Sequence, residues 1–115
     1  MKNQSNTPII LVTGAGRGLG QGIATELAEA GMSVAIHYGN SKQGAEQTIK
    51  MCEDRATKPG QVFKMIQGDL SDAQSRTQIV SSTLEAFGHL DALINNAGIT
   101  EPNRRDCLHA TEEDY

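Results

Sequence analysis

The segment Thr13–Gly20 reads T-G-A-G-R-G-L-G and contains the residues with the clearest chemical potential. Glycine lets a backbone approach a phosphate without a Cβ clash, and a helix N-terminus offers free N–H groups at its positive end. A plain strand-to-helix turn needs one or two glycines. This turn has four, which predicts phosphate binding: Gly14, Gly16, Gly18 and Gly20.

The spacing of these glycines is G-x-x-x-G-x-G, which does not fit G-x-G-x-x-G because Leu19 occupies the last slot. It is not a P-loop either, because no Lys-Ser or Lys-Thr follows the glycines. The context still favours a dinucleotide, because an apolar run precedes the turn and an amphipathic helical pattern follows it.

The segment His37–Lys42, which reads H-Y-G-N-S-K, bears on the choice between NADP and NAD. NAD-binding proteins place Asp or Glu about 20 residues beyond the glycines to hold the ribose 2′-OH. Here no carboxylate appears until Glu46, and Arg17 is available for a 2′-phosphate. We therefore predict NADP(H) rather than NAD. Asn40 and Ser41 can donate further hydrogen bonds to the 2′-phosphate, Lys42 can add charge, and Tyr38 is expected to line the same site. His37 is expected to be a strand-end residue near the adenine rather than an acid or base.

Alternating apolar runs and helical patterns predict an α/β Rossmann-type parallel sheet with helices on both faces. Its expected strand order is 3-2-1-4, an incomplete doubly wound fold with the nucleotide across the carboxyl edge. The apolar face expected for the first helix consists of Leu19, Ile23, Leu27 and Ala30, joined by Ala24 and Ala28. Ser41 is expected to cap the second helix, and Ser71 or Asp72 the third. The expected strands are Pro8–Val12, Met32–Tyr38, Gln61–Gln67 and Leu90–Asn95, and the expected helices are Gly18–Ala30, 42–55 and 72–87.

Three motifs give the chain a family resemblance. They are T-G-x-x-x-G-x-G at Thr13–Gly20, the pair Asp69-Leu70 after the third strand, and N-N-A-G at Asn95–Gly98 after the fourth. With these motifs at suitable spacing, the chain resembles the short-chain dehydrogenase/reductase family. Within that family, Leu93–Thr100 (L-I-N-N-A-G-I-T) looks most like the 3-oxoacyl-[acyl carrier protein] reductase branch.

The resemblance implies a role for each matching residue. Asp69 would accept a hydrogen bond from the adenine amino group, the Leu70 backbone would support the ring, and Asn95 would tie the central strands together. The ribose would lie near Asn96, Ala97 and Gly98. The pyrophosphate and adenosine side would be wrapped by Gly14, Arg17, Gly18, Leu19 and Gly20.

The chain contains no catalytic residue that we can name. Tyr38 and Lys42 have the Y-x-x-x-K spacing of the family's catalytic pair, but a Gly-Asn turn separates them. The resemblance places the family's Ser, Tyr and Lys beyond Tyr115, and its catalytic Asn in a helix expected to begin at Thr111. Residues 1–115 are thus expected to be the cofactor-binding half of a hydride-transferring oxidoreductase acting on a carbonyl or alcohol, inactive alone. A non-catalytic nucleotide-binding module and one half of a split enzyme remain alternatives.

Composition and charge also limit the classes of partner that the chain is expected to bind. The net charge of −4 argues against nucleic acid and anionic membranes, and neither a signal peptide nor a membrane span is apparent. Cys52 and Cys107 fit no metal or redox spacing, so we expect no metal, and reduced thiols in a cytoplasmic protein. Intact family members are usually homo-oligomers. The isolated chain is expected to be weakly stable or to associate, because its fourth strand would form an edge.

Overall fold

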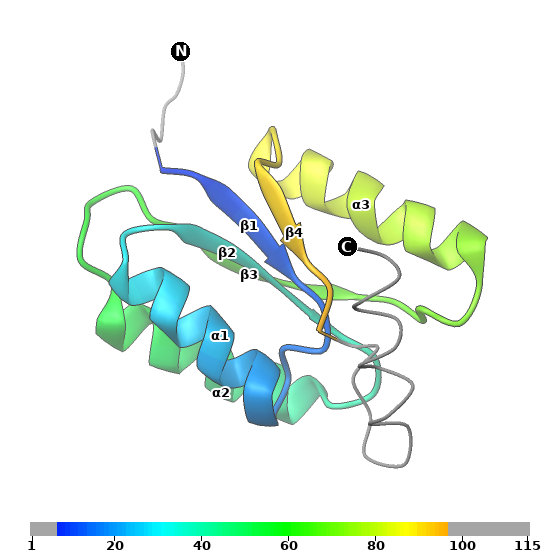
Figure 1. Ribbon diagram of the computed structural model, residues 1–115, viewed down its shortest axis with the longest axis horizontal. Helices are drawn as coiled ribbons and strands as arrows, with labels where there is room; N and C mark the ends of the chain where they lie inside the picture. Colours follow the sequence, from blue (N-terminus) through cyan, green and yellow to red (C-terminus); the bar gives the residue numbers. More distant parts are fainter. Residues whose placement is uncertain (1–6, 97–115) are drawn as a thin grey trace, which may run out of the picture.

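A computed structural model describes residues 7–96, which form an open parallel sheet covered by helices on both faces (Figure 1). The helices α1 and α2 lie on one face of the sheet, and α3 lies on the other. The elements, in chain order, are β1 (Ile9–Val12), α1 (Gly18–Glu29), β2 (Ser33–Tyr38), α2 (Lys42–Arg55), β3 (Phe63–Gln67), α3 (Ala73–Phe87) and β4 (Ala92–Ile94). The predictions for Ala97, Gly98 and the helix at Thr111 fall outside the described residues.

The strand order is β3-β2-β1-β4, and each neighbouring pair is parallel. Leu11 is the register partner of Ala35 on one side and of Leu93 on the other. This confirms the predicted fold and strand order. β3 begins two residues later than predicted, and β4 is shorter by two residues at its start and by one at its end, whereas the other bounds agree within one residue. Side chains contribute at these corners: Gln61 Nε2 donates to the Ala28 carbonyl, and Asp91 Oδ2 accepts from the Ile9 N–H.

Burial follows from position in the sheet. All residues of the two central strands, β1 and β2, are buried, whereas β3 and β4 lie at the edges and are mostly exposed or half-buried. Side chains of the central strands alternate between two apolar clusters. One cluster packs under α1 and α2 around Val12, Val34 and Ile36, and the other packs under α3 around Leu11, Ala35 and Ile79.

The buried face of α1 agrees with the prediction at Ala24 and Ala28 and differs at Leu19 and Ala30, which are exposed. Leu19 is 61% exposed, so its assignment to the apolar face was wrong. The face that packs inward consists of the small residues Gly20, Ala24 and Ala28, and the larger Ile23 and Leu27 are half-buried beside it. Small residues let α1 lie close to the sheet, and apolar periodicity alone does not distinguish this face from its neighbour.

The helix ends differ in how they are closed. Asp72 caps α3 by accepting a hydrogen bond from the Ser75 N–H at 2.8 Å, which confirms one of the two expected caps. Ser41 occupies the N-cap position of α2, but its side chain makes no capping bond, contrary to expectation. Gly88 ends α3 and Gly31 follows α1, both with positive φ (92° and 97°), as C-terminal glycines commonly do.

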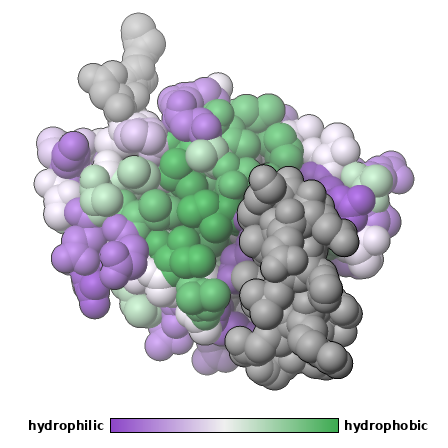
Figure 2. All heavy atoms as spheres, in the orientation of Figure 1, coloured by the Kyte–Doolittle hydropathy of each residue, from purple (hydrophilic) through white to green (hydrophobic). Residues whose placement is uncertain are grey.

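An apolar surface lies on the side of the molecule where β1 and β4 face the viewer in Figures 1 and 2. Leu93 on β4 is 52% exposed and Leu84 on α3 is 44% exposed. Among residues 7–96, no helix has the length and hydropathy required to cross a membrane.

Candidate dinucleotide-binding site

The glycine turn joins the carboxyl end of β1 to the start of α1. Gly14 and Gly18 have positive φ values of 64° and 58°, which a side chain would strain. Gly20 has a different requirement: a Cβ there would overlap the carbonyl oxygen of Gly14 and would lie 2.6 Å from Asn96 Nδ2. The glycines therefore serve both the bend of the backbone and its close packing.

Helix α2 supports this turn from beneath. A Cβ on Gly44 would overlap the carbonyl oxygen of Gly16, so the two backbones touch directly. The fully buried Thr48 hydroxyl donates to the Ala15 carbonyl at 2.8 Å and accepts from Gln21 Nε2 at 2.8 Å. These contacts fix the middle of the turn and the first turn of α1 to one side chain.

The end of β4 supports the turn from the other side. The Thr13 hydroxyl donates to Asn95 Oδ1 at 3.2 Å, which joins the end of β1 to the end of β4. The Asn96 N–H donates to the Thr13 hydroxyl at 2.9 Å, and Asn96 Nδ2 donates to the Gly14 carbonyl at 3.2 Å. The first residues of the N-N-A-G motif thus contact the first residues of the glycine motif.

His37, near the end of β2, lies directly beside the turn. Its Nδ1 accepts from the Gly14 N–H at 3.0 Å, and its Nε2 is 2.8 Å from the Gly68 carbonyl oxygen. The Ala15 N–H donates to the His37 carbonyl at 2.7 Å. Burial lowers the pKa of His37 and outweighs the opposing effect of the hydrogen bond to Gly68. Sequence reasoning treated His37 as a strand-end residue near the adenine and missed this bridging role.

Two hollows adjoin the turn. One, of about 690 Å³, lies over the N-terminus of α2 and contains two cationic residues, Arg17 and Lys42, and no carboxylate. The other, of about 510 Å³, lies between the turn and the end of β3. Its lining brings together predicted site residues from three segments: Gly14, Asn40, Asp69 and Leu70.

The predicted adenosine residues surround these hollows. Tyr38 is buried, and it lines the first hollow together with Gly16, Asn40 and Ser41. Asp69 is exposed, and its Oδ1 accepts from the Ser71 N–H at 2.9 Å. Hydrogen bonds from the Ser71 backbone and side chain lower the pKa of Asp69, so its carboxylate is charged at neutral pH.

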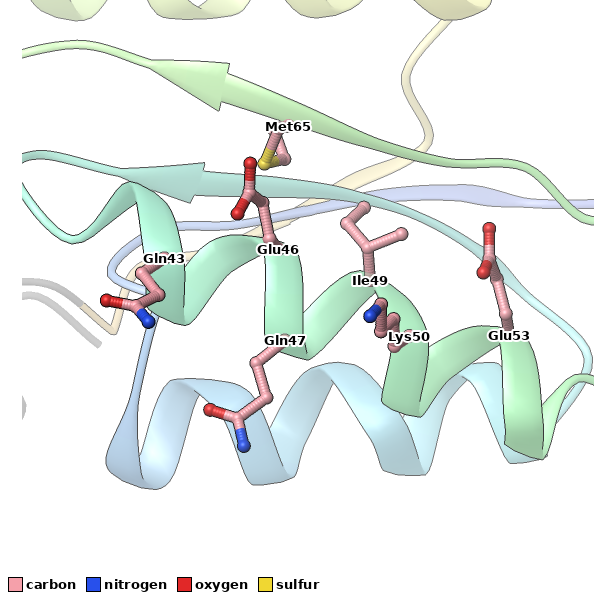
Figure 3. A pocket seen from close by; sticks show the side chains of 7 residues that line it. All are labelled: Gln43, Glu46, Gln47, Ile49, Lys50, Glu53 and Met65. Carbon is pink, nitrogen blue, oxygen red and sulfur yellow. The ribbon is translucent and has the colours of Figure 1, made fainter.

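Another hollow, of about 740 Å³, lies along the outer side of α2 near β3 (Figure 3). Side chains of mixed charge, Glu46, Lys50 and Glu53, surround the apolar Ile49 and Met65. Its lining contains no glycine and no residue of the turn after β1. It therefore lacks the features that recognise a dinucleotide.

Other candidate chemistry is sparse in the described part of the chain. Within residues 7–96, no group of three or more His, Cys, Asp or Glu side chains is placed to hold a metal ion. Tyr38 ends β2 and Lys42 begins α2, so the Y-x-x-x-K pair lies on two elements rather than on one helix face. Cys52 is buried, and desolvation together with Glu53 raises its pKa to about 12.

An open parallel sheet with a glycine turn at its carboxyl edge defines a dinucleotide-binding α/β protein of the Rossmann type. The family model for short chain dehydrogenases matches residues 8–114. The chain therefore belongs to the short-chain dehydrogenases, a family of oxidoreductases that bind a nicotinamide cofactor.

Individual relatives agree with this membership. The chain is 42% identical over 97 residues to the 3-oxoacyl-[acyl-carrier-protein] reductase of Staphylococcus aureus, covering 84% of this chain. It is 36% identical over 107 residues to a hydroxynaphthalene reductase-like protein of Metarhizium guizhouense, covering 93% of this chain. The chain spans 38% of the length of each of these two relatives.

Solved structures share the fold. A dehydrogenase from Burkholderia cenocepacia with bound NADP is 30% identical, with a TM-score of 0.70 over 77% of this chain and 33% of its own. An NADH-dependent reductase complexed with NAD has a TM-score of 0.69 over 77% of this chain and 35% of its own, at 24% identity. The second likeness concerns the fold alone.

Proposed function

We propose that residues 1–115 form the NADP(H)-binding part of an oxidoreductase that transfers hydride between nicotinamide and a carbonyl or alcohol substrate. One observation carries the proposal. The N-terminus of α1 is left open behind a glycine turn, at the sheet edge where parallel α/β proteins bind nucleotides.

The start of α1 supports the pyrophosphate assignment. Its first intrahelical hydrogen bond runs from the Gln21 N–H to the Arg17 carbonyl at 3.3 Å, so the N–H groups of Gly18, Leu19 and Gly20 precede it. No side chain caps this helix, and its first turn contains no acidic residue. Free amides at the positive end of a helix suit the two negative charges of a pyrophosphate.

The hollow over α2 supports NADP rather than NAD. Arg17 and Lys42 supply positive charge there, and no carboxylate in the lining would repel a 2′-phosphate. The first intrahelical bond of α2, from the Ala45 N–H to the Ser41 carbonyl at 3.0 Å, leaves a second helix N-terminus facing the same hollow. The two cations and the helix dipole all favour binding of the negatively charged 2′-phosphate.

The remaining residues would orient the coenzyme. Asp69 and Leu70 would hold the adenine from the end of β3, and Asn96 is close enough to the turn to contact the ribose side. Ala97 and Gly98 are assigned to the ribose by resemblance. When bound, the coenzyme supplies the hydride, and these protein groups supply position and electrostatic complementarity.

The substrate proposal rests on the relatives. Two of them, at 42% and 36% identity, are named as reductases, one of 3-oxoacyl-[acyl-carrier-protein] and one like a hydroxynaphthalene reductase. A 3-oxoacyl thioester is therefore the first substrate class that we propose. The residues described here would bind and orient the coenzyme, and proton transfer to the substrate is not assigned to any of them.

The test is calorimetric titration of NADP⁺ and NAD⁺ into the wild-type chain and into Arg17→Ala. Loss of a charge-assisted hydrogen bond of about 1.5–3 kcal/mol should weaken NADP⁺ binding by roughly 10- to 100-fold and change NAD⁺ binding much less. Arg55→Ala is the matched control, because Arg55 lies at the far end of α2, 3.4 Å from Glu29 on the surface. Equal or tighter binding of NAD⁺ by the wild type would refute the NADP assignment.

A second candidate function, one part of a split enzyme, is favoured by the exposed apolar residue Leu93 on the edge strand β4, where another polypeptide would dock. A stand-alone nucleotide-binding module is the third reading. Sequencing beyond the codon for Tyr115 separates them. A Y-x-x-x-K in the same frame supports the first proposal, one in a neighbouring frame supports the split enzyme, and none supports the module.

A further inference from the structure

His37 links the two turns that the proposed coenzyme would contact. It lies on β2, between the turn after β1 and the turn after β3, and it is 2% exposed. One nitrogen of its ring meets Gly14, and the other meets Gly68. Gly14 begins the phosphate-binding turn, and Gly68 immediately precedes Asp69, so one imidazole spans the phosphate side and the adenine side of the site.

The partners determine where the ring proton lies. A backbone N–H can only donate, so Nδ1 must offer a lone pair to Gly14 at 3.0 Å. A carbonyl can only accept, so Nε2 must carry the proton toward Gly68 at 2.8 Å. Both bonds therefore require the neutral Nε2–H tautomer. The imidazolium ion would put a second N–H against the Gly14 N–H and break that contact.

The backbone around His37 reinforces the link. The His37 carbonyl accepts from the Ala15 N–H at 2.7 Å, and the Tyr38 carbonyl accepts from the Gly68 N–H at 3.2 Å. Gly68 also packs tightly under α3, because a Cβ there would overlap Ile79. A shift of the imidazole would thus be transmitted to both turns rather than absorbed by one.

We propose that the neutral imidazole of His37 is a positioning residue, which holds the phosphate-binding turn and the Gly68–Asp69 turn at the separation that a dinucleotide requires. The inference rests on the proposed coenzyme function, and it assigns His37 no contact with the substrate. It predicts that dinucleotide affinity depends on the acceptor that His37 presents to Gly14.

Few charged groups of the described chain face His37. Asp69 lines the same hollow, and the segment from Ile9 to Gly16 contributes no ionisable side chain. On α3, which covers this face of the sheet, Asp72 is engaged in its cap, and Arg76 donates to the Leu70 carbonyl at 2.8 Å. Tyr38 points to the opposite cluster, under α1 and α2.

The pH dependence follows from the direction of the shift. Burial lowers the folded-state pKa of His37 below its ordinary value of 6.5, so the unfolded chain binds the proton more readily. The contribution of the neutral His37 imidazole to the stability of the folded chain is complete above pH 6.5, and it is lost as the pH falls through the folded-state pKa. We expect dinucleotide affinity to fall in the same acidic range.

Two variants of the full chain separate the two ring contacts. In His37→Asn, Oδ1 can take the place of Nδ1 and keep the acceptor for Gly14. In His37→Gln, the longer amide can take the place of Nε2, and Gly14 loses its acceptor. Calorimetry with NADP⁺ at pH 7.5 should find His37→Asn about three- to tenfold weaker than wild type, because the Gly68 turn is released. His37→Gln should be at least about tenfold weaker, because it also leaves a buried donor unsatisfied. A His37→Asn variant that binds like wild type would overturn the proposed link between the two turns.

The control is His89→Asn, which changes an exposed histidine 2.9 Å from Asp91 and should bind like wild type. Between pH 7.5 and 5, affinity should fall more steeply for wild type and His89→Asn than for His37→Asn. The 2′-phosphate of the ligand titrates equally in all three proteins. In ¹⁵N NMR spectra at pH 7, Nδ1 of His37 should give the signal of an unprotonated ring nitrogen, with or without ligand.

The outcomes are distinguishable. If the wild type binds no dinucleotide, the proposed function fails. If the wild type binds but His37→Gln matches it, or if NMR finds a proton on Nδ1 at pH 7, the proposed role of His37 is wrong.

Discussion

Two strand-to-helix turns at the same edge of the sheet are built in opposite ways. The turn after β3 closes itself: Asp69 accepts from the Ser71 N–H, and Asp72 accepts from the Ser75 N–H, two and three residues along the chain. The turn after β1 has no such local partner. Arg17 is the N-cap residue of α1, and its side chain makes no capping bond.

Distant residues complete the turn after β1. Gly14 meets His37, 23 residues away, and Asn96, 82 residues away, and Ala15 meets Thr48, 33 residues away. The two turns show two ways to build the N-terminus of a helix, whose first backbone N–H groups have no partner within the helix. A locally capped turn is complete before any ligand arrives, whereas a turn fixed by the surrounding fold keeps its helix amides free for one.

The largest expected effect comes from Gly20→Ala. Its Cβ would overlap the Gly14 carbonyl, so we expect a loss of about 3 kcal/mol in the free energy of unfolding, together with loss of dinucleotide binding. Gly22→Ala is the control two residues along the same helix. Its Cβ would have no neighbour within 4 Å, and the change should stabilise the chain by about 0.5–1 kcal/mol. Urea unfolding measures both, and equal effects would contradict the close approach.

Thr48→Val tests the distant support with little change in volume. The buried hydroxyl serves the Ala15 carbonyl and Gln21 Nε2, and its removal should cost about 1–3 kcal/mol of unfolding free energy. NADP⁺ affinity should fall with it, because the middle of the turn is released. A variant as stable as wild type would show that the turn needs no support from α2.

Asp72→Ala should have the smallest effect and completes the comparison. Loss of this cap should lower the free energy of unfolding by about 1 kcal/mol. NADP⁺ affinity should stay within about twofold of wild type, because the cap serves only its own helix. A large loss of affinity would mean that the two turns are not independent.

Much of the fold could be predicted from local patterns. Short apolar runs such as Ile9–Val12 mark buried parallel strands, and glycines such as Gly31 and Gly88 mark helix ends. Strand order followed from the handedness and connection rules for alternating strands and helices. The face of α1 was harder to predict, since Leu19 and Gly20 are adjacent and close packing favoured the smaller residue.

The candidate site was predicted in its glycines and motif residues but not in its supports. His37 and Thr48 belong to no short motif, and their partners are brought near by the sheet and by the packing of α2. Sequence reasoning saw a strand-end histidine and did not single out the threonine. The signal that could have found them is a polar residue at a position where the apolar pattern predicts burial. A buried polar group requires a hydrogen-bond partner.

At the opposite, amino-terminal end of the sheet, Gln61 uses its whole amide group. Its Nε2 donates to the carbonyls of Ala28 and Met32, and its Oε1 accepts from the N–H groups of Thr57 and Lys58. One uncharged side chain thus anchors the exit of α1, the approach to β2 and the loop before β3. The contacts that hold the scaffold together and the turns proposed to bind the ligand therefore lie at opposite ends of the strands. The turns at the carboxyl edge can change to suit another ligand while the contacts of Gln61 preserve the fold.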